Sequence, residues 1–174
     1  LDDWRRSLDM ALAQEPLRRR YDAVVIATGA TVPRELEIPG RGLTGVMPAM
    51  DFLVASNRVQ AGTLEATPFD AAGKHVVVIG GGDTGADCVG TAHRQGARSV
   101  TNLAIGRKPS ETRTEAQPWP VHPTLYEVSS SHEEGGERKY LASTVEFVAD
   151  ESGKLVRGLH IAETGFTENG REPI

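Results

Sequence analysis

A glycine-rich turn, set between an apolar strand and a helix, constrains the fold of this chain more than any other feature of its sequence. A strand is predicted over His75–Ile79, because four consecutive β-branched residues form the short apolar run of a buried parallel strand. The strand leads into Gly80-Gly81-Gly82-Asp83-Thr84-Gly85, which matches the G-x-G-x-x-G pattern. Helical spacing follows over Thr84–Gln95. The pattern predicts a turn that binds the pyrophosphate of a dinucleotide.

Each of the three glycines in this pattern occupies a position where a side chain would interfere. Gly80 permits a tight turn, Gly82 lets the backbone approach a pyrophosphate, and Gly85 lets the helix pack closely on the strand. The start of the helix offers free N–H groups and a partial positive charge to phosphates. Asp83 is expected to cap the helix, to contact a ribose, or to do both. The alternative is a tight turn that binds no ligand.

The remaining periodicity predicts an α/β fold. A second apolar strand over Ser99–Ile105 is expected to run parallel to the first, with both faces of the sheet covered. A further helix is predicted over Met47–Arg58, and residues 108–137 are expected to be loop. Strands over Ser143–Ala149 and Lys154–Ala162 form a predicted hairpin. The expected architecture is a Rossmann-like parallel sheet with flanking helices and an added β-hairpin, in three layers.

The first part of the chain is predicted to be a separate unit. Leu1–Arg20 has the spacing of a surface helix, and Tyr21–Ala30 is an apolar run expected to be a buried, central strand. Thr31–Gly45 is rich in proline and glycine, which favours a linker. We therefore predict a division into residues 1–43 and 44–174, within a piece of a longer polypeptide.

Basic residues after the second predicted strand indicate which dinucleotide is bound. Proteins that prefer NAD place a carboxylate near this point, where it bonds the ribose 2′-hydroxyl. Here Ala104 and Gly106 are followed by Arg107-Lys108, with Arg113 close behind. Three cations and no carboxylate favour the 2′-phosphate of NADPH. One alternative is that these cations only keep a surface loop soluble. Another is that the glycine-rich turn belongs to a methyl-transfer domain, which the basic residues after the second strand disfavour.

Composition excludes several classes of partner. The formal net charge is −5 and the pI is about 5.6, which disfavours nucleic acid and anionic membranes. The single cysteine, Cys88, is expected to be a buried apolar residue, and the lack of disulfides and of a membrane span predicts a cytoplasmic protein. The five histidines have no metal-ligand spacing, so no metal site is predicted.

Longer strings of residues resemble one family. Three of them occur in the same order as in the small (beta) subunit of NADPH-dependent glutamate synthase: YDAVVIATG at Tyr21–Gly29, IPGR at Ile38–Arg41 and GGGDTGADC at Gly80–Cys88. The resemblance continues to about Glu163, through Asn102–Lys108, Pro118–Pro120 and Ser130–Gly135. The ATG string alone is shared with adrenodoxin reductase-like flavoenzymes, so the longer combination carries the resemblance.

The resemblance implies an oxidoreductase that passes hydride from NADPH to FAD and electrons through iron-sulfur clusters to the large (alpha) subunit. That subunit makes glutamate from 2-oxoglutarate and glutamine-derived ammonia. The family's cysteine-rich region and its FAD-binding segments are missing here, and one cysteine cannot hold a cluster. FAD and the clusters are therefore expected only in the full-length protein, and this fragment is expected to bind nucleotide without catalysing a reaction.

Carried over by position, the resemblance implies a set of cofactor-binding residues and no catalytic or metal-binding residue. The family often has an acidic residue where Ala104 stands, and its absence favours NADPH. Glu133 and Glu134 face either the nicotinamide end, a partner or solvent. The alternative functions are a regulatory or docking module without redox chemistry, or the NADPH domain of a related FAD-dependent reductase. The implied cofactor-binding residues are Gly80, Gly81, Gly82, Asp83, Thr84, Gly85, Arg107, Lys108, Arg113, Thr28 and Gly29.

Overall fold

The computed structural model describes residues 19–25, 32–168 and 170–174. The chain divides into two compact units, Leu1–Pro33 and Arg34–Ile174. In the first unit, residues 19 and 20 are helical, and the rest of the predicted helix lies outside the described residues. The prediction of a buried strand is wrong for residues 21–25, which are exposed and form no strand. A β-branched run becomes a strand only when another strand pairs with it, and none of the described strands does.

Three parallel strands form one of the two sheets of the second unit. They are β1 (His75–Ile79), β2 (Ser99–Leu103) and β3 (Glu137–Lys139), in the order β1-β2-β3. β1 pairs with β2 from His75↔Ser99 onward, and β2 pairs with β3 from Thr101↔Glu137 onward. The predicted parallel pair is confirmed, although β2 ends two residues before the predicted limit. β3 was not predicted, since the expected loop reaches Glu137 and no element was assigned to Arg138 and Lys139.

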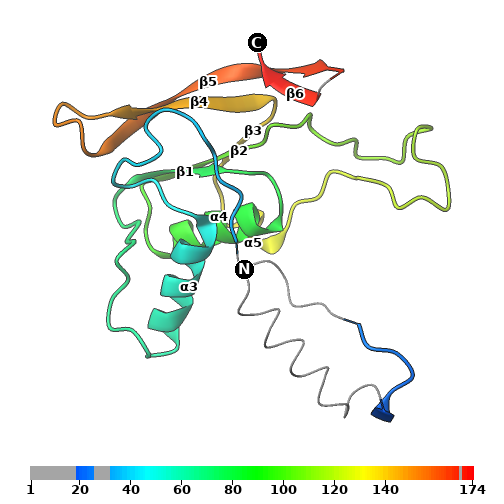
Figure 1. Ribbon diagram of the computed structural model, residues 1–174, viewed down its shortest axis with the longest axis horizontal. Coiled ribbons are helices and arrows are strands. Elements are labelled where there is room, and N and C mark those ends of the chain that lie inside the picture. Colours follow the sequence, from blue (N-terminus) through cyan, green and yellow to red (C-terminus); the bar gives the residue numbers. More distant parts are fainter. Residues whose placement is uncertain (1–18, 26–31, 169) are drawn as a thin grey trace. The chain divides into compact units, whose positions relative to one another are not determined.

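Helices cover one face of this sheet (Figure 1). They are α3 (Ala49–Gln60), α4 (Asp83–Arg94) and the short α5 (Ser130–Glu133). The first two are confirmed, whereas α5 falls in the segment predicted to be loop. The core lies between α4 and the sheet, with Phe52 and Leu53 of α3 packed against it; its buried members are Ala71, Val78, Cys88, Val89, Ala92 and Val100.

Antiparallel strands form a second sheet on the other side of the parallel one (Figure 1). They are β4 (Ala142–Ala149), β5 (Val156–Thr167) and β6 (Gly170–Pro173). The predicted hairpin of the first two strands is confirmed, and β6 is an additional strand. The three expected layers are thus present, but β1 is only partly covered on this side, where Val77 is 41% and Ile79 is 43% exposed. β1 is an edge strand, so its outer flank has no strand beside it in the described sheet.

The turn of the hairpin is fixed by one carboxylate. Asp150 Oδ1 accepts hydrogen bonds from the Ser152 hydroxyl at 2.7 Å and from the backbone N–H of Leu155 at 3.1 Å. These donors stabilise the charged form, so they lower the pKa of Asp150 below its usual value.

The proline- and glycine-rich segment before α3 is bound to the antiparallel sheet. Phe147 N–H donates to the Pro39 carbonyl at 2.9 Å, and Thr44 exchanges hydrogen bonds with Lys154 and Val156 at 2.9 and 3.0 Å. A segment of linker composition therefore packs within the second unit. Among the described residues, no helix has the length and apolar character needed to cross a membrane.

Leu103→Ala is expected to lower the free energy of unfolding by about 2–5 kcal/mol, because truncation of a buried leucine leaves a cavity. The Leu103 side chain is only 1% exposed. Urea denaturation followed by circular dichroism measures the change. The matched control is Leu155→Ala in the hairpin turn, where leucine is 50% exposed; a change below about 0.5 kcal/mol is expected there. Equal losses in both variants would contradict this assignment of the core.

Candidate functional site

Close contacts or backbone conformation require glycine at three positions of the turn between β1 and α4. A Cβ atom on Gly85 would lie 2.2 Å from the Gly80 carbonyl oxygen, and one on Gly81 would lie 2.7 Å from the Ala104 Cβ. Gly80 has a φ of +127°, a conformation that other residues rarely adopt. These three glycines are therefore explained by the fold itself, and they do not by themselves indicate a ligand.

Gly82 is different, because neither packing nor backbone conformation requires glycine there. A Cβ atom at this position would meet nothing within 4 Å, and the φ of −90° is open to any residue. Gly82 is also the N-cap of α4, and no side chain caps the helix. The alternative that Asp83 caps the helix is thus wrong, since Asp83 is already the first helical residue. Asp83 and Thr84 are exposed, so the start of α4 is open to solvent, which suits an anion.

A buried asparagine on β2 holds this turn in place. Asn102 is 2% exposed, and its side-chain amide donates to the carbonyls of Val78 at 3.2 Å and Gly80 at 2.7 Å. The amide nitrogen also lies 3.6 Å from the position of a Cβ atom on Gly85. Sequence reasoning missed this residue, although one polar side chain in an apolar strand beside a glycine turn is a usable signal. Asn102 fixes the glycine turn to the centre of the sheet.

Hydrogen bonds join the loop after β2 to the end of β3. Ala104 N–H donates to the Lys139 carbonyl at 2.7 Å, and Leu141 N–H donates to the Gly106 carbonyl at 2.9 Å. Because Gly81 lies against Ala104, the glycine turn, this loop and the end of β3 meet at one edge of the sheet. These are the carboxyl ends of parallel strands, where open α/β sheets bind their ligands.

The three basic residues predicted to hold a 2′-phosphate have different surroundings. The Arg107 guanidinium lies 4.4 Å from the centre of the Phe166 ring. Lys108 forms an ion pair with Glu111 at 3.5 Å and lies 4.1 Å from the centre of the Tyr126 ring. Arg113 donates from one nitrogen to the carbonyls of Gln117 at 2.9 Å and Val121 at 2.7 Å. Of the three, Arg113 is the one that is hydrogen-bonded to the loop backbone.

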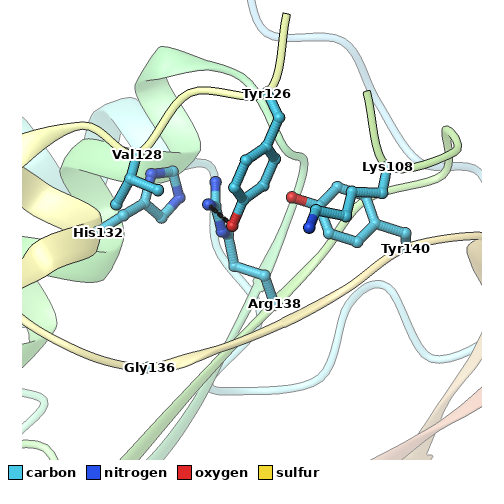
Figure 2. A pocket seen from close by; sticks show the side chains of 7 residues that line it. All are labelled: Lys108, Tyr126, Val128, His132, Gly136, Arg138 and Tyr140. Carbon is cyan, nitrogen blue, oxygen red and sulfur yellow. Dashed lines mark hydrogen bonds between the residues drawn. The ribbon is translucent and has the colours of Figure 1, made fainter. Parts of the chain in front are cut away.

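Lys108 also lines an open cavity of about 460 Å³ beside β3 (Figure 2). Tyr126 and Arg138 point toward each other across it, and His132 approaches from α5. Burial and the positive charge of Arg138 lower the pKa of His132. Among the other predicted site residues, Gly80–Thr84 are exposed at the turn, whereas Thr28 and Gly29 lie outside the described residues.

Other reactive groups are accounted for by the fold. Cys88 is buried as predicted, and burial together with Asp87 raises its pKa to about 11, so the thiol is unreactive at neutral pH. Glu134 pairs with Arg94 of α4, while Glu133 is exposed on α5. Within the described ranges, no three His, Cys, Asp or Glu side chains are grouped to bind a metal ion.

Known proteins share both the sequence and the fold. Residues 9–119 match the pyridine nucleotide-disulphide oxidoreductase family. The glutamate synthase (NADPH) small chain of Mycobacterium tuberculosis is 54% identical over 142 residues, which are 79% of this chain and 29% of that protein. The glutamate synthase (NADH) of Schizosaccharomyces pombe is 39% identical over 165 residues, which are 90% of this chain and 8% of that one.

A solved structure is similar to the fold at low sequence identity. The Mycobacterium tuberculosis FprA structure in complex with NADPH is 18% identical, with a TM-score of 0.52, and the match covers 90% of this chain and 47% of that one. This likeness supports a dinucleotide-binding reductase fold. The chain spans less than a third of the two glutamate synthase chains and less than half of FprA.

Asn102→Asp is expected to destabilise the fold by about 3 kcal/mol at neutral pH, because a buried carboxylate would face two carbonyl oxygens without a donor. Such burial raises the folded-state pKa of the new carboxyl group. The loss in the free energy of unfolding therefore grows as the pH rises above about 3.9, the pKa of the carboxyl group in the unfolded chain. It levels off above the pKa of the same group in the folded chain. Urea titrations at pH 4 and pH 7 measure it. Asn57→Asp, on the exposed side of α3, is the control; a pH-independent loss in Asn102→Asp would contradict the argument.

Proposed function

Since this chain belongs to the pyridine nucleotide-disulphide oxidoreductase family, we propose that it binds NADPH and holds the nicotinamide for hydride transfer to FAD. The observation that carries the proposal is Gly82, a glycine that the fold does not require, beside an uncapped helix start. A side chain there would occupy the space that a pyrophosphate needs. The glycine turn of this chain thus fits the cofactor of the family.

The basic loop supports NADPH over NADH. Among the relatives, one name contains NADPH and another contains NADH, so the names alone do not decide the cofactor. Leu103, at the end of β2, is followed by Ala104 rather than by a carboxylate, and Arg107 and Lys108 are exposed in the next residues. An exposed cation attracts the 2′-phosphate, whereas a carboxylate would repel it.

For the longer protein, we propose the role of a glutamate synthase small chain. The identity to the Mycobacterium tuberculosis small chain supports this choice over other FAD-dependent reductases. In that role, electrons from NADPH pass through FAD and iron-sulfur clusters to a large subunit, in the cytoplasm, for reductive glutamate synthesis from glutamine and 2-oxoglutarate. Residues 44–174 would be the NADPH domain and residues 1–43 part of an FAD domain, with the end of that part, at Pro39, hydrogen-bonded to Phe147 of the NADPH domain.

The proposed reaction needs no catalytic side chain from this protein. Bound NADPH supplies the hydride, so no nucleophile or general base is needed. The N–H groups at the start of α4 bind the pyrophosphate, and Asn102 keeps the turn that presents them rigid. The isolated chain would bind nucleotide but not complete the reaction.

Calorimetric titration of the 174-residue chain with NADPH, NADH and FAD at fixed salt is the direct test. NADPH is expected to bind at least about tenfold more tightly than NADH, and FAD no better than NADH, because only NADPH carries the 2′-phosphate. Arg107→Ala is expected to reduce the preference for NADPH over NADH. The control is Arg157→Ala, an exposed residue of β5, which should leave the preference unchanged. If neither nicotinamide binds, a docking module without redox chemistry becomes the better explanation.

Gly82→Ser separates the ligand-binding role of this glycine from a structural one. Serine is a good N-cap, so the free energy of unfolding is expected to stay the same or rise by a few tenths of a kcal/mol. NADPH affinity is expected to fall about tenfold or more, because the side chain enters the space of the pyrophosphate and caps the N–H groups. Thermal unfolding and titration measure the two effects. Gly42→Ser is the control, since a Cβ atom there also meets nothing; unchanged NADPH affinity in Gly82→Ser would contradict the proposal.

A further inference from the structure

The cavity beside β3 is positively charged and carries no acidic side chain of its own. Figure 2 shows its lining, in which Lys108 and Arg138 are the cations and Tyr126 and Tyr140 are the aromatic residues. The remaining lining residues are Val128, His132 and Gly136. Lys108 forms an ion pair at 3.5 Å with Glu111, which does not line the cavity. The charge of Arg138 is not matched by an ion pair with any described residue.

Arg138 is held in a fixed position by neutral groups. One guanidinium nitrogen donates to the Tyr126 hydroxyl at 2.5 Å, and another donates to the Glu127 carbonyl at 3.1 Å. The guanidinium also lies 4.7 Å from the centre of the Tyr126 ring. A guanidinium has five N–H donors, so most remain available to a ligand. An arginine held in this way is ready to bind an anion at little cost in side-chain entropy.

Lys108 and Arg138 share one aromatic ring. The Lys108 ammonium lies 4.1 Å from the centre of the Tyr126 ring, close to the same ring that Arg138 contacts. Figure 2 shows the two cations on opposite sides of this ring, so both add to the positive charge of the cavity. A dianionic phosphate that entered the cavity would be attracted by both cations.

The cavity lies next to the loop where the adenosine end of a dinucleotide is expected. Arg138 precedes Lys139, whose carbonyl accepts the hydrogen bond from Ala104 at the end of β2. Ala104 in turn packs against Gly81 of the glycine turn. In this class of fold, the residue at the end of the second strand contacts the ribose 2′-position. Arg138 is thus one strand away from the group that distinguishes NADPH from NADH.

The geometry points to Arg138 as a specificity-determining residue that binds the 2′-phosphate of NADPH together with Lys108, with Tyr126 as its positioning residue. This inference rests on the proposed function. Arg138 would act in addition to Arg113, whose guanidinium donates from one nitrogen to two carbonyl oxygens of its own loop. The basic residue for the 2′-phosphate then comes from β3 as well as from the loop after β2.

Titration of Arg138→Gln with NADPH, NADH, adenosine 2′-monophosphate and adenosine 5′-monophosphate tests the assignment. NADPH and adenosine 2′-monophosphate are expected to bind about tenfold or more weakly than to the unchanged chain, while NADH and adenosine 5′-monophosphate bind as before. Arg157→Gln, an exposed cation on β5, is the matched control and should leave all four affinities unchanged. If Arg138→Gln keeps the full preference for NADPH, the inference is overturned and the proposed function stands. If the unchanged chain itself shows no preference, the NADPH proposal fails, and the role of Arg138 fails with it.

A second measurement needs no substitution and therefore does not depend on the folding of a variant. Phenylglyoxal modifies accessible arginines, and mass spectrometry maps the modified positions on the unchanged chain. NADPH is expected to slow modification of Arg138 several-fold, whereas NADH at equal occupancy does not. The Arg157 guanidinium, exposed elsewhere, should react at the same rate with either nucleotide. Equal modification of Arg138 under both conditions would overturn the inference.

Discussion

The close approach of the first turn of α4 to the end of β1 is the constraint on which the rest of the structure depends. A Cβ atom on Gly85 would lie 2.2 Å from the Gly80 carbonyl oxygen, so helix and strand meet without any side chain between them. Asn102 then binds the same carbonyl from β2. The turn is therefore fixed from two sides, and the start of the helix is aimed at the edge of the sheet where the strands end.

The central strand β2 connects this turn to the other parts of the site. Its side chains contribute to the core through Val100 and to the turn through Asn102. Its carboxyl end leads into the basic loop, and its second edge pairs with β3, which carries Arg138. A change in the position of β2 would therefore move the glycine turn and both cations of the cavity together.

The sequence predicted those elements whose residue pattern is local to the element itself. Apolar runs and helical spacing predicted β1, α4, β2 and the hairpin, because these elements bury one face against the core. β3 could not be predicted in this way, since Glu137-Arg138-Lys139 has no apolar face and becomes a strand only because β2 offers its backbone. For the same reason Tyr21–Val25, apolar but without a paired neighbour, is not a strand. The placement of Arg138 near Lys108 is a tertiary fact, thirty residues apart in sequence, that no local pattern contains.

Only one glycine of the turn is evidence for a ligand, because the fold itself explains the others. Gly80, Gly81 and Gly85 are required by backbone conformation or by close contacts within the chain, so a turn that binds nothing would need them equally. Gly82 has an ordinary φ and open space where a Cβ atom would lie, and serine or asparagine there would cap α4 better. The protein alone gives no reason for glycine at that position. The proposed pyrophosphate, which must approach the backbone, gives one, and the start of α4 beside Gly82, which no side chain caps, suits an anion.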